Sequence, residues 1–239
     1  MAEQEIIKHT KNALNTWGSD KGFWHKLKDF VLEIFIIVFA ITLSIYLHDR
    51  SEKKHQRHET EEFLLGLKED LKTDLVEMSE DKKTFQQSSD AFKYITSVKM
   101  NEKLNADTLK KYENRMFNST GFVPNDGRFE GFKSSGKIGN IENAALQNNI
   151  MDLYQENIPA LILSTDRYAV LKRQFQDYVY QNKKRLTDTT DNFPVLLTTD
   201  PAINISRNLV FIDEILSRYN TCIAKINRII ADIGEEYEK

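Results

Sequence analysis

The residues most suggestive of chemistry form the run GFKSSGK at positions 131–137, which has the spacing of a phosphate-binding loop up to its lysine. In such a loop the lysine contacts the phosphates and a hydroxyl on the next residue binds magnesium. Position 138 is isoleucine, so this hydroxyl is missing, and no buried apolar strand precedes the run. The sequence therefore favours a basic, glycine-rich turn over a nucleotide-binding site.

Histidine and cysteine are poorly placed for metal binding or for nucleophilic catalysis. The five histidines all lie in the first quarter of the chain: His9, His25, His48, His55 and His58. His55 and His58 could share a helix face, but two ligands do not make a metal site. Cys222 lies in an apolar row and is predicted to be a small core residue. We therefore predict no catalytic residues, no metal, no cofactor and no enzyme activity.

The composition narrows the class of protein further. The chain has 239 residues, with 33 Lys plus Arg against 36 Asp plus Glu and a formal charge of -3. It lacks the excess of positive charge that phosphate contacts need, so nucleic acid is not an expected partner. Nine glycines and four prolines are few for a turn-rich β fold, which makes an all-α chain the expectation.

An apolar run, FVLEIFIIVFAITLSIYL at positions 30–47, is the first element of this all-α chain. Its length is close to the roughly 20 apolar residues of a membrane crossing. The predicted anchor residues in and beside the run are Trp24, Glu33, Tyr46 and Arg50. The alternatives are a signal peptide, which would have a shorter apolar region and a small-residue cleavage site, or a buried core helix. We predict one transmembrane helix in a bacterial inner membrane, preceded by a short tail at residues 1–29.

The charges around the run constrain its orientation only weakly. Three lysines precede it and four basic residues follow it, so the positive-inside rule is nearly balanced. A long soluble domain can be translocated regardless of its charge, and we place residues 48–239 in the periplasm on that ground. Glu33, near the start of the run, is expected to reach the headgroup region. An oligomer contact or a proton-coupled site is the alternative for this carboxylate.

A stalk helix is predicted to continue from the apolar run to about residue 98. Its apolar residues recur at helical spacing, and one row has residues seven apart: Leu64, Leu71, Met78, Phe85 and Phe92. The opposite face carries Glu, Lys and Asp. We interpret that face as exposed to solvent.

Shorter helices and loops are expected after the stalk. Asp107 is predicted to cap a short helix that ends near residue 116. Glycine, proline and asparagine make residues 117–139 the main irregular segment. The remaining expected elements are helices at about 140–157 and 159–186 with Leu186 facing inward, a loop at 187–202, and a last helix that starts at Asp200 and Pro201.

The last helix has the strongest periodic pattern in the chain. Its stripe, spaced alternately by four and three residues, includes Leu209, Ile212, Leu216, Tyr219, Ile223, Ile226 and Ile230. A third apolar row beside the stripe indicates more than one neighbouring helix: Ile215, Cys222 and Ile229. We predict a soluble antiparallel helical bundle whose core is this helix, residues 64–98 and residues 159–186. Association of several chains through the same stripe is the alternative.

Two separated blocks of the sequence resemble a known family. The first block is Glu33 with the apolar run, then SEKK at 51–54 and FLLGLKEDL at 63–71; the second is FKSSGKI at 132–138, then Ile141, Glu142, Asn143, Leu146, Leu153 and Tyr154. In this order they resemble bacterial single-pass membrane proteins grouped as domain of unknown function 6090. Where that family has an Asn-rich, Trp-containing patch after the span, this chain has LHDR at 47–50. The resemblance implies a membrane-anchored helical protein and no established activity.

Two functions of different classes fit these patterns. The first is an anchored interaction or structural module whose partners are the lipid bilayer and either another protein or a second copy of the chain. The second is a sensor that binds a small molecule between helices. Its pocket would be lined by aromatic residues: Tyr168, Phe175, Tyr178 and Tyr180.

Overall fold

The structure is a computed structural model that describes residues 23–99, 102 and 104–237, with the side chains of residues 23–26 outside the description. Every regular element in this part of the chain is a helix, and the one strand-like pairing described is an isolated bridge between Arg185 and Asp191. The all-α fold class is therefore confirmed. The chain divides into two compact units, Met1–Glu59 and Thr60–Lys239, and each is described by itself.

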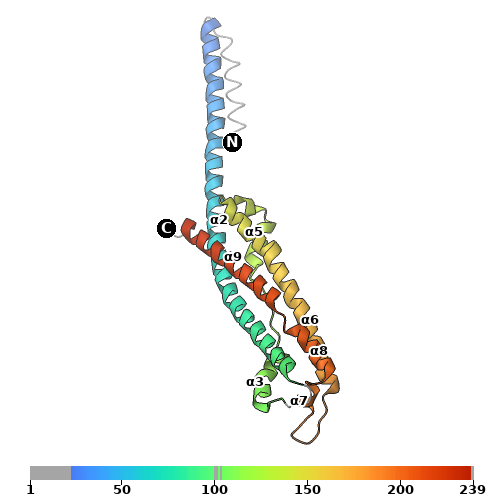
Figure 1. The fold of residues 1–239 in the computed structure, drawn as a ribbon. Coiled ribbons are helices and arrows are strands. Elements are labelled where there is room, and N and C mark those ends of the chain that lie inside the picture. The colour runs from blue at the N-terminus through green and yellow to red at the C-terminus, as the bar shows by residue number, and fades with distance from the viewer. Residues whose placement is uncertain (1–22, 100–101, 103, 238–239) are drawn as a thin grey trace. The chain divides into compact units, whose positions relative to one another are not determined.

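The described part of the first unit is helical and belongs to α2, Phe23–Ser97, which continues into the second unit (Figure 1). This helix contains a candidate membrane span near the N-terminus, with a mean hydropathy of 2.6 and none of its apolar window buried. Phe35, for example, is 65% exposed. A core helix of a globular unit would cover such residues, and the described residues leave the window uncovered.

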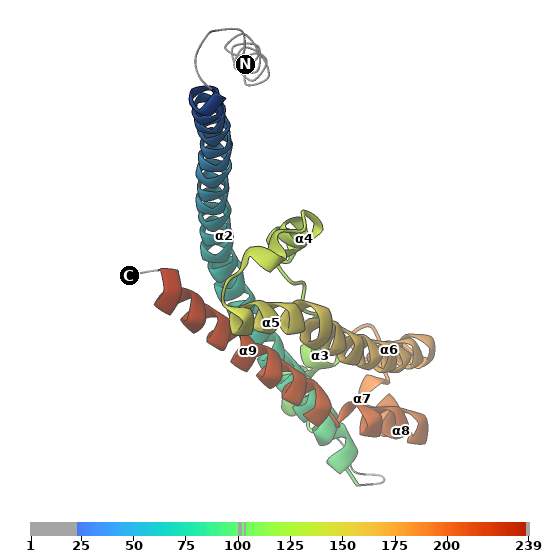
Figure 2. The ribbon, with the colours of Figure 1, turned by 90° about the horizontal axis from the view of Figure 1, so that it is seen from above.

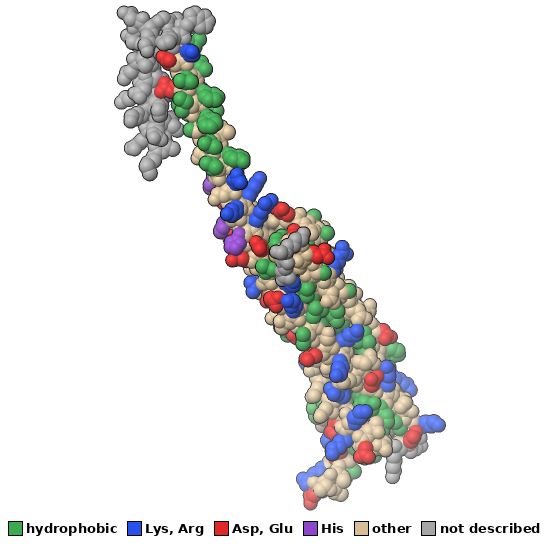
Figure 3. All heavy atoms as spheres, turned by 90° about the vertical axis from the view of Figure 1, so that its left-hand side faces the viewer, with side chains coloured by type: hydrophobic (Ala, Val, Ile, Leu, Met, Phe, Trp, Pro, Cys, Tyr) green, Lys and Arg blue, Asp and Glu red, His purple; other side chains and the backbone are tan. Residues whose placement is uncertain are grey.

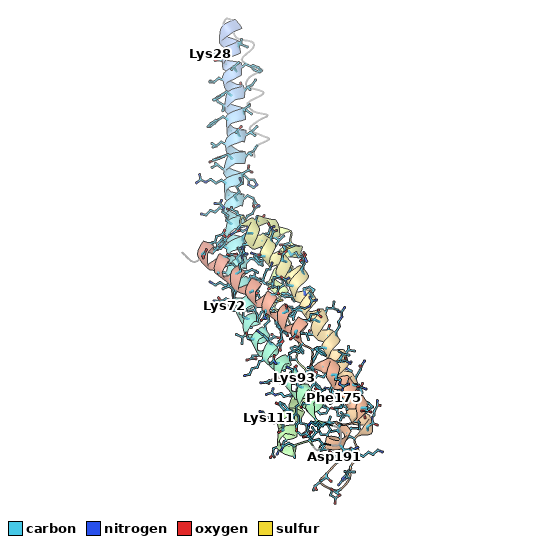
Figure 4. The ribbon with its side chains drawn as sticks, viewed as in Figure 1. Lys28, Lys72, Lys93, Lys111, Phe175 and Asp191 are labelled. Atoms are coloured by element: carbon cyan, nitrogen blue, oxygen red, sulfur yellow. The ribbon has the colours of Figure 1, made fainter. Side chains whose placement is uncertain are left out.

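The core of the second unit is formed by the second half of α2 together with α6, Ile158–Asn182, and α9, Asp213–Tyr237. Phe85 of α2 contacts Tyr168 of α6 and Tyr219 of α9, with ring centroids 5.4 Å and 5.9 Å apart. Further along, Phe92 meets Phe175 edge-to-face at 5.0 Å. Phe175 lies in a region densely filled with side chains (Figure 4). The three segments predicted to form the core do form it.

The helices of this core do not all run antiparallel. Ser88 and Phe92 of α2 contact Lys172 and Phe175 of α6 in the same order, so α6 runs parallel to α2. The contacts of α9 with α2 run in the opposite order, and only α9 is antiparallel (Figure 1). The parallel arrangement of α2 and α6 is possible because the residues between them run back along α2. The returning elements are α3, Ala106–Phe117; α4, Gly127–Ser134; η1, Lys137–Asn140; and α5, Ala144–Asp152.

The chain between α2 and α6 contains more helix than its glycine content predicts. Residues 117–139, expected to be irregular, include all of α4 and the start of η1. Asn105, not Asp107, caps α3, because its side-chain oxygen accepts a hydrogen bond from the Thr108 N–H at 2.9 Å. Asn143 caps α5 in the same way. The helix expected from residue 140 therefore starts four residues later.

A π-helical turn, η2 at Leu153–Asn157, joins α5 directly to α6. Pro159 occupies the first turn of α6, as predicted. The helix ends at Asn182, and Leu186, predicted to face inward, is 63% exposed. The expected loop that follows contains a short helix, α7, Phe193–Leu196.

The predicted last helix is two helices. The first, α8, spans Asp200–Leu209, and α9 begins only at Asp213. The carbonyls at the break accept hydrogen bonds from other helices: Tyr168 donates to Leu209 at 3.1 Å and Ser89 donates to Val210 at 2.7 Å. These bonds replace the next turn of helix, which accounts for a break with no glycine or proline.

Candidate functional site

The two blocks that carry the family resemblance pack against each other where α4 lies beside α2 (Figure 2). Phe63 of α2 stacks on Phe132 of α4, with ring centroids 3.9 Å apart and planes 2° from parallel. The Arg128 guanidinium bonds to Asp70 at 2.9 Å and lies against Gly66 in the space that a Cβ atom would fill. The absence of a side chain at Gly66 thus leaves room for the guanidinium of Arg128 beside α2.

An acid row on one face of α2 continues from this contact. Its members are Asp70, Asp74, Glu77 and Asp81, at spacings of four, three and four residues, which places them on one side of a helix. The chain after α3 runs along this row as a return segment at residues 118–126, followed by α4. Four residues donate to the row in reverse order: the Thr120 hydroxyl to Asp81, the Val123 N–H to Glu77, the Asn125 backbone N–H and side-chain amide to Asp74, and Arg128 to Asp70.

Two members of the acid row are buried inside the bundle. Asp81 is 5% exposed and also accepts a hydrogen bond from the Tyr219 hydroxyl at 3.0 Å, so one carboxylate joins α2, the return segment and α9. Proximity to this carboxylate and burial raise the pKa of Tyr219, with burial the larger cause. Burial also raises the pKa of Asp74, while the bonds from Asn125 oppose the shift. A buried carboxylate needs such partners, because desolvation without them costs several kcal/mol.

A buried lysine of α6, Lys172, completes the polar interior beside Ser88, about two turns beyond Asp81 along α2. The Lys172 ammonium donates to Ser88 at 2.6 Å, to the Arg115 carbonyl at 2.9 Å and to the Asn118 carbonyl. The two carbonyls lie at the C-terminal end of α3, where backbone oxygens lack helical partners and a positive charge is favoured. Burial lowers the pKa of Lys172 to about 8, so the group is still mostly charged at neutral pH.

Three buried polar atoms near the acid row and η2 have no hydrogen-bond partner among the described residues: Asp74 Oδ2, the Tyr154 hydroxyl and Asn157 Oδ1. Tyr154 stacks on Phe129 at 4.3 Å. Burial raises the pKa of Tyr154, and the charges of Asp74 and Asp70 add to this effect. Two of the three atoms belong to the π-helical turn, a distortion that recurs at functional sites.

The four aromatic residues expected to line a sensor pocket lie in different environments within the described bundle. A cavity of about 10 Å³ lies beside Ser88, Thr120, Tyr168 and Lys172, which is room for one water molecule. The four candidate aromatics separate: Tyr168 and Phe175 are core residues, Tyr178 bonds to Thr199, and Tyr180 is 67% exposed. Among the described residues, no cluster of three or more His, Cys, Asp or Glu could hold a metal ion.

The GFKSSGK run, three of the histidines and Cys222 lie in helices or in the turn that follows α4. Four residues of GFKSSGK lie within α4, so residues 131–134 form no loop around a phosphate, and Gly136 makes the turn with a φ of 75°. His48, His55 and His58 lie on α2, where His55 is 3.4 Å from Glu59. The side chain of His25 and all of His9 lie outside the description. Cys222 is fully buried, as predicted, and burial raises the pKa of its thiol to about 11.

The predicted anchor residues lie on α2, and the predicted stripe residues lie on α8, on α9 and between these two helices. Glu33, Tyr46 and Arg50 lie on α2, the last two exposed, and the side chain of Trp24 is outside the description. Four stripe residues are buried in the chain's own bundle: Leu209, Ile212, Tyr219 and Ile226. Three others, spaced seven residues apart, are only partly buried: Leu216, Ile223 and Ile230. The third row, with Cys222, faces the core more fully than these three.

The sequence does not predict the acid row, because charged residues at helical spacing are typical of a solvated face. A pattern that could have identified it is a second row of residues seven apart on α2: Leu67, Asp74, Asp81, Ser88 and Ile95. All five are buried. Polar residues in a row that begins and ends with core residues indicate buried groups with specific partners.

Comparison with known proteins supports the resemblance of the two blocks. A family model described as "Family of unknown function (DUF6090)" matches residues 33–188, which is more than half of the chain and includes the acid row and α4. No curated protein and no solved structure matches the chain.

Proposed function

The chain belongs to the family of unknown function DUF6090, and we propose that it is a non-enzymatic, membrane-anchored helical module that interacts with the bilayer and with a protein partner. The observation that carries the proposal is the exposed apolar surface of α2. Over residues 30–47 its large apolar side chains are uncovered. Monomeric soluble proteins rarely expose contiguous apolar surface of this kind, and lipid is the environment that its length fits.

Extraction of membranes with alkaline carbonate tests the anchor. The wild-type chain is expected to remain in the membrane pellet. Replacing Val38 and Phe39 by arginine places two charges near the centre of the span, where each costs about 3 kcal/mol, and should shift the chain to the supernatant. A matched control replaces Leu163 and Val170, exposed apolar residues of α6, by arginine and should remain in the pellet. Release of the wild-type chain by carbonate would refute the proposal.

The interaction role of the bundle is the second part of the proposal. Its support is the partly exposed row Leu216, Ile223 and Ile230, which continues along α9 beside the buried stripe and offers an apolar surface to another helix. The partner in this proposal is another protein or a second copy of the chain. Crosslinking in membranes followed by affinity purification tests it. Recovery of the chain solely as a monomer would count against this part.

The location proposed for the chain is a bacterial inner membrane with residues 48–239 in the periplasm. The support is the length of the helical domain after the span, since long domains are translocated largely regardless of their charge. A reporter fused to the C-terminus that is active only in the periplasm should give a signal. A signal from the complementary cytoplasmic reporter alone would reverse the orientation and leave the anchor intact.

A further inference from the structure

The helix surface directly after the candidate span carries a concentrated positive charge. We define a basic collar as Arg50, Lys53, Lys54 and Arg57, whose spacings of three, one and three residues place them on one face of α2. All four side chains are exposed. Figure 3 shows blue and purple side chains gathered where the green apolar surface of the span ends. The collar therefore presents four positive charges at one end of an apolar surface.

The collar residues also share one open surface groove. The groove is lined by the four basic residues together with Tyr46 and Asp49. Its lining thus carries four formal positive charges and one negative charge, with an aromatic ring on the side of the span. A tyrosine at this place is typical of the membrane interface, where the ring contacts acyl chains and the hydroxyl contacts water.

The distances along α2 place Arg50 within a headgroup layer and place Lys53 and Lys54 within side-chain reach of it. At 1.5 Å per residue, Arg50 lies about 4.5 Å beyond Leu47, and Lys54 lies about 10 Å beyond it. The headgroup region on each side of a bilayer is roughly 5–7 Å thick. Lysine and arginine side chains bend toward this layer while their stems stay on apolar surface. Three collar residues can therefore place their charges among the headgroups of the leaflet next to residue 47.

We infer that the basic collar binds anionic phospholipid headgroups of the membrane that α2 crosses. The inference rests on the proposed membrane anchor and adds to it a lipid class and the residues that recognise it. Anionic lipids have no choline or amine to neutralise their phosphate, so their headgroups carry a net negative charge. The net positive charge of the groove lining complements it. Arginine binds such phosphates through two parallel N–H groups, and lysine binds them as a point charge.

Photocrosslinking in nanodiscs tests the inference with the full-length chain. Nanodiscs of mostly phosphatidylcholine contain a trace of photoactivatable phosphatidylglycerol or, in the parallel sample, of photoactivatable phosphatidylcholine. Adducts are mapped by peptide mass spectrometry. In 0.1 M salt the anionic probe should label residues 46–57 at least about fivefold more than the zwitterionic probe does. In 1 M salt the preference should fall below about twofold, because the Debye length shortens to about 3 Å.

Two variants with equal changes in net charge separate a specific site from general attraction. The collar variant is R50Q/K53Q/K54Q/R57Q, and its preference for the anionic probe should fall below twofold. The control variant replaces four exposed basic residues of the second unit: K110Q/K111Q/R173Q/K184Q. It should keep the wild-type preference.

The possible failures are distinguishable. Equal labelling of residues 46–57 by the two probes, or an unchanged preference in the collar variant, would overturn the inference while the chain stays in the nanodiscs. A loss of preference in the control variant would overturn it as well, because it would show attraction by net charge alone. A chain that does not co-purify with nanodiscs would instead overturn the anchor on which the collar depends.

Discussion

Replacing Lys172 by methionine tests whether the buried ammonium group stabilises the bundle. Methionine retains most of the length of the side chain but removes all three donors, so Ser88 and the carbonyls of Arg115 and Asn118 lose a partner. Hydrogen bonds to a charged group contribute roughly 1.5–3 kcal/mol each, or about 5–9 kcal/mol for three. The pKa of about 8, against the ordinary 10.5, indicates a desolvation cost of about 3 kcal/mol. We expect Lys172→Met to lower the free energy of unfolding by about 2–5 kcal/mol at pH 7.

The pH dependence of this difference follows from the lowered pKa. Between pH 8 and 10.5 the unfolded chain holds a proton on Lys172 that the folded chain has released, so the contribution of this group to stability rises with pH. From pH 7.5 to pH 9.5 the rise is about 2 kcal/mol. Lys172→Met lacks this titration. The free-energy difference between the wild-type chain and the variant should therefore widen by that amount over this range.

Unfolding by guanidinium chloride provides the assay. The full chain in detergent micelles is followed by the near-ultraviolet circular dichroism of its tyrosines, which reports packing in the bundle, at pH 7.5, 8.5 and 9.5. Lys93→Met, at an exposed position on α2, is the matched control and should change the free energy of unfolding by less than about 1 kcal/mol. A difference between wild type and Lys172→Met that stays constant with pH, or a variant as stable as wild type, would refute the reasoning.

Three further predictions use the same chain. Tyr219→Phe removes a hydrogen bond to a buried carboxylate and should lower the free energy of unfolding by about 1.5–3 kcal/mol in the same denaturation assay; an unchanged value contradicts it. Gly66→Ala displaces the guanidinium of Arg128 from Asp70, losing at most about 1 kcal/mol, but gains about 1 kcal/mol of helix propensity. Its net effect should lie within about 1 kcal/mol of zero, and it should stabilise the chain by about 1 kcal/mol when Arg128 is already alanine. Cys222, buried with a pKa of about 11, should react with iodoacetamide at pH 8 only after denaturant is added, and rapid alkylation of the folded chain would show an open site.

The three-helix core could be predicted from the sequence because its periodicity is local to each segment. Phe85 and Phe92 stand in a row of residues seven apart, and Tyr219 stands in the α9 stripe; all three are core residues. Pro159 likewise gives the start of α6 within one residue, since its fixed φ suits the first turn of a helix. Where burial depends on a pattern within one helix, the sequence is sufficient.

The parts that could not be predicted depend on contacts between distant segments. Asp74 and Asp81 look like surface residues until the return segment lies over them with its own donors. The break between α8 and α9 likewise depends on hydroxyl groups of Ser89 and Tyr168, which are more than 40 residues away in the chain. Residues 209–212, where the helix breaks, contain no glycine or proline that would indicate the break.

The position of Asp81 has a consequence for the synthesis of the chain. Its hydrogen-bond partner Tyr219 is 138 residues further along the chain, so a ribosome must reach α9 before the carboxylate can enter its final environment. Until then the carboxylate can accept the hydrogen bond of the Thr120 hydroxyl but not that of Tyr219. The contact between α2 and α9 joins segments far apart in the chain, and loop-closure entropy makes the formation of such contacts slow. Translation of the C-terminal helix therefore determines when the bundle can close.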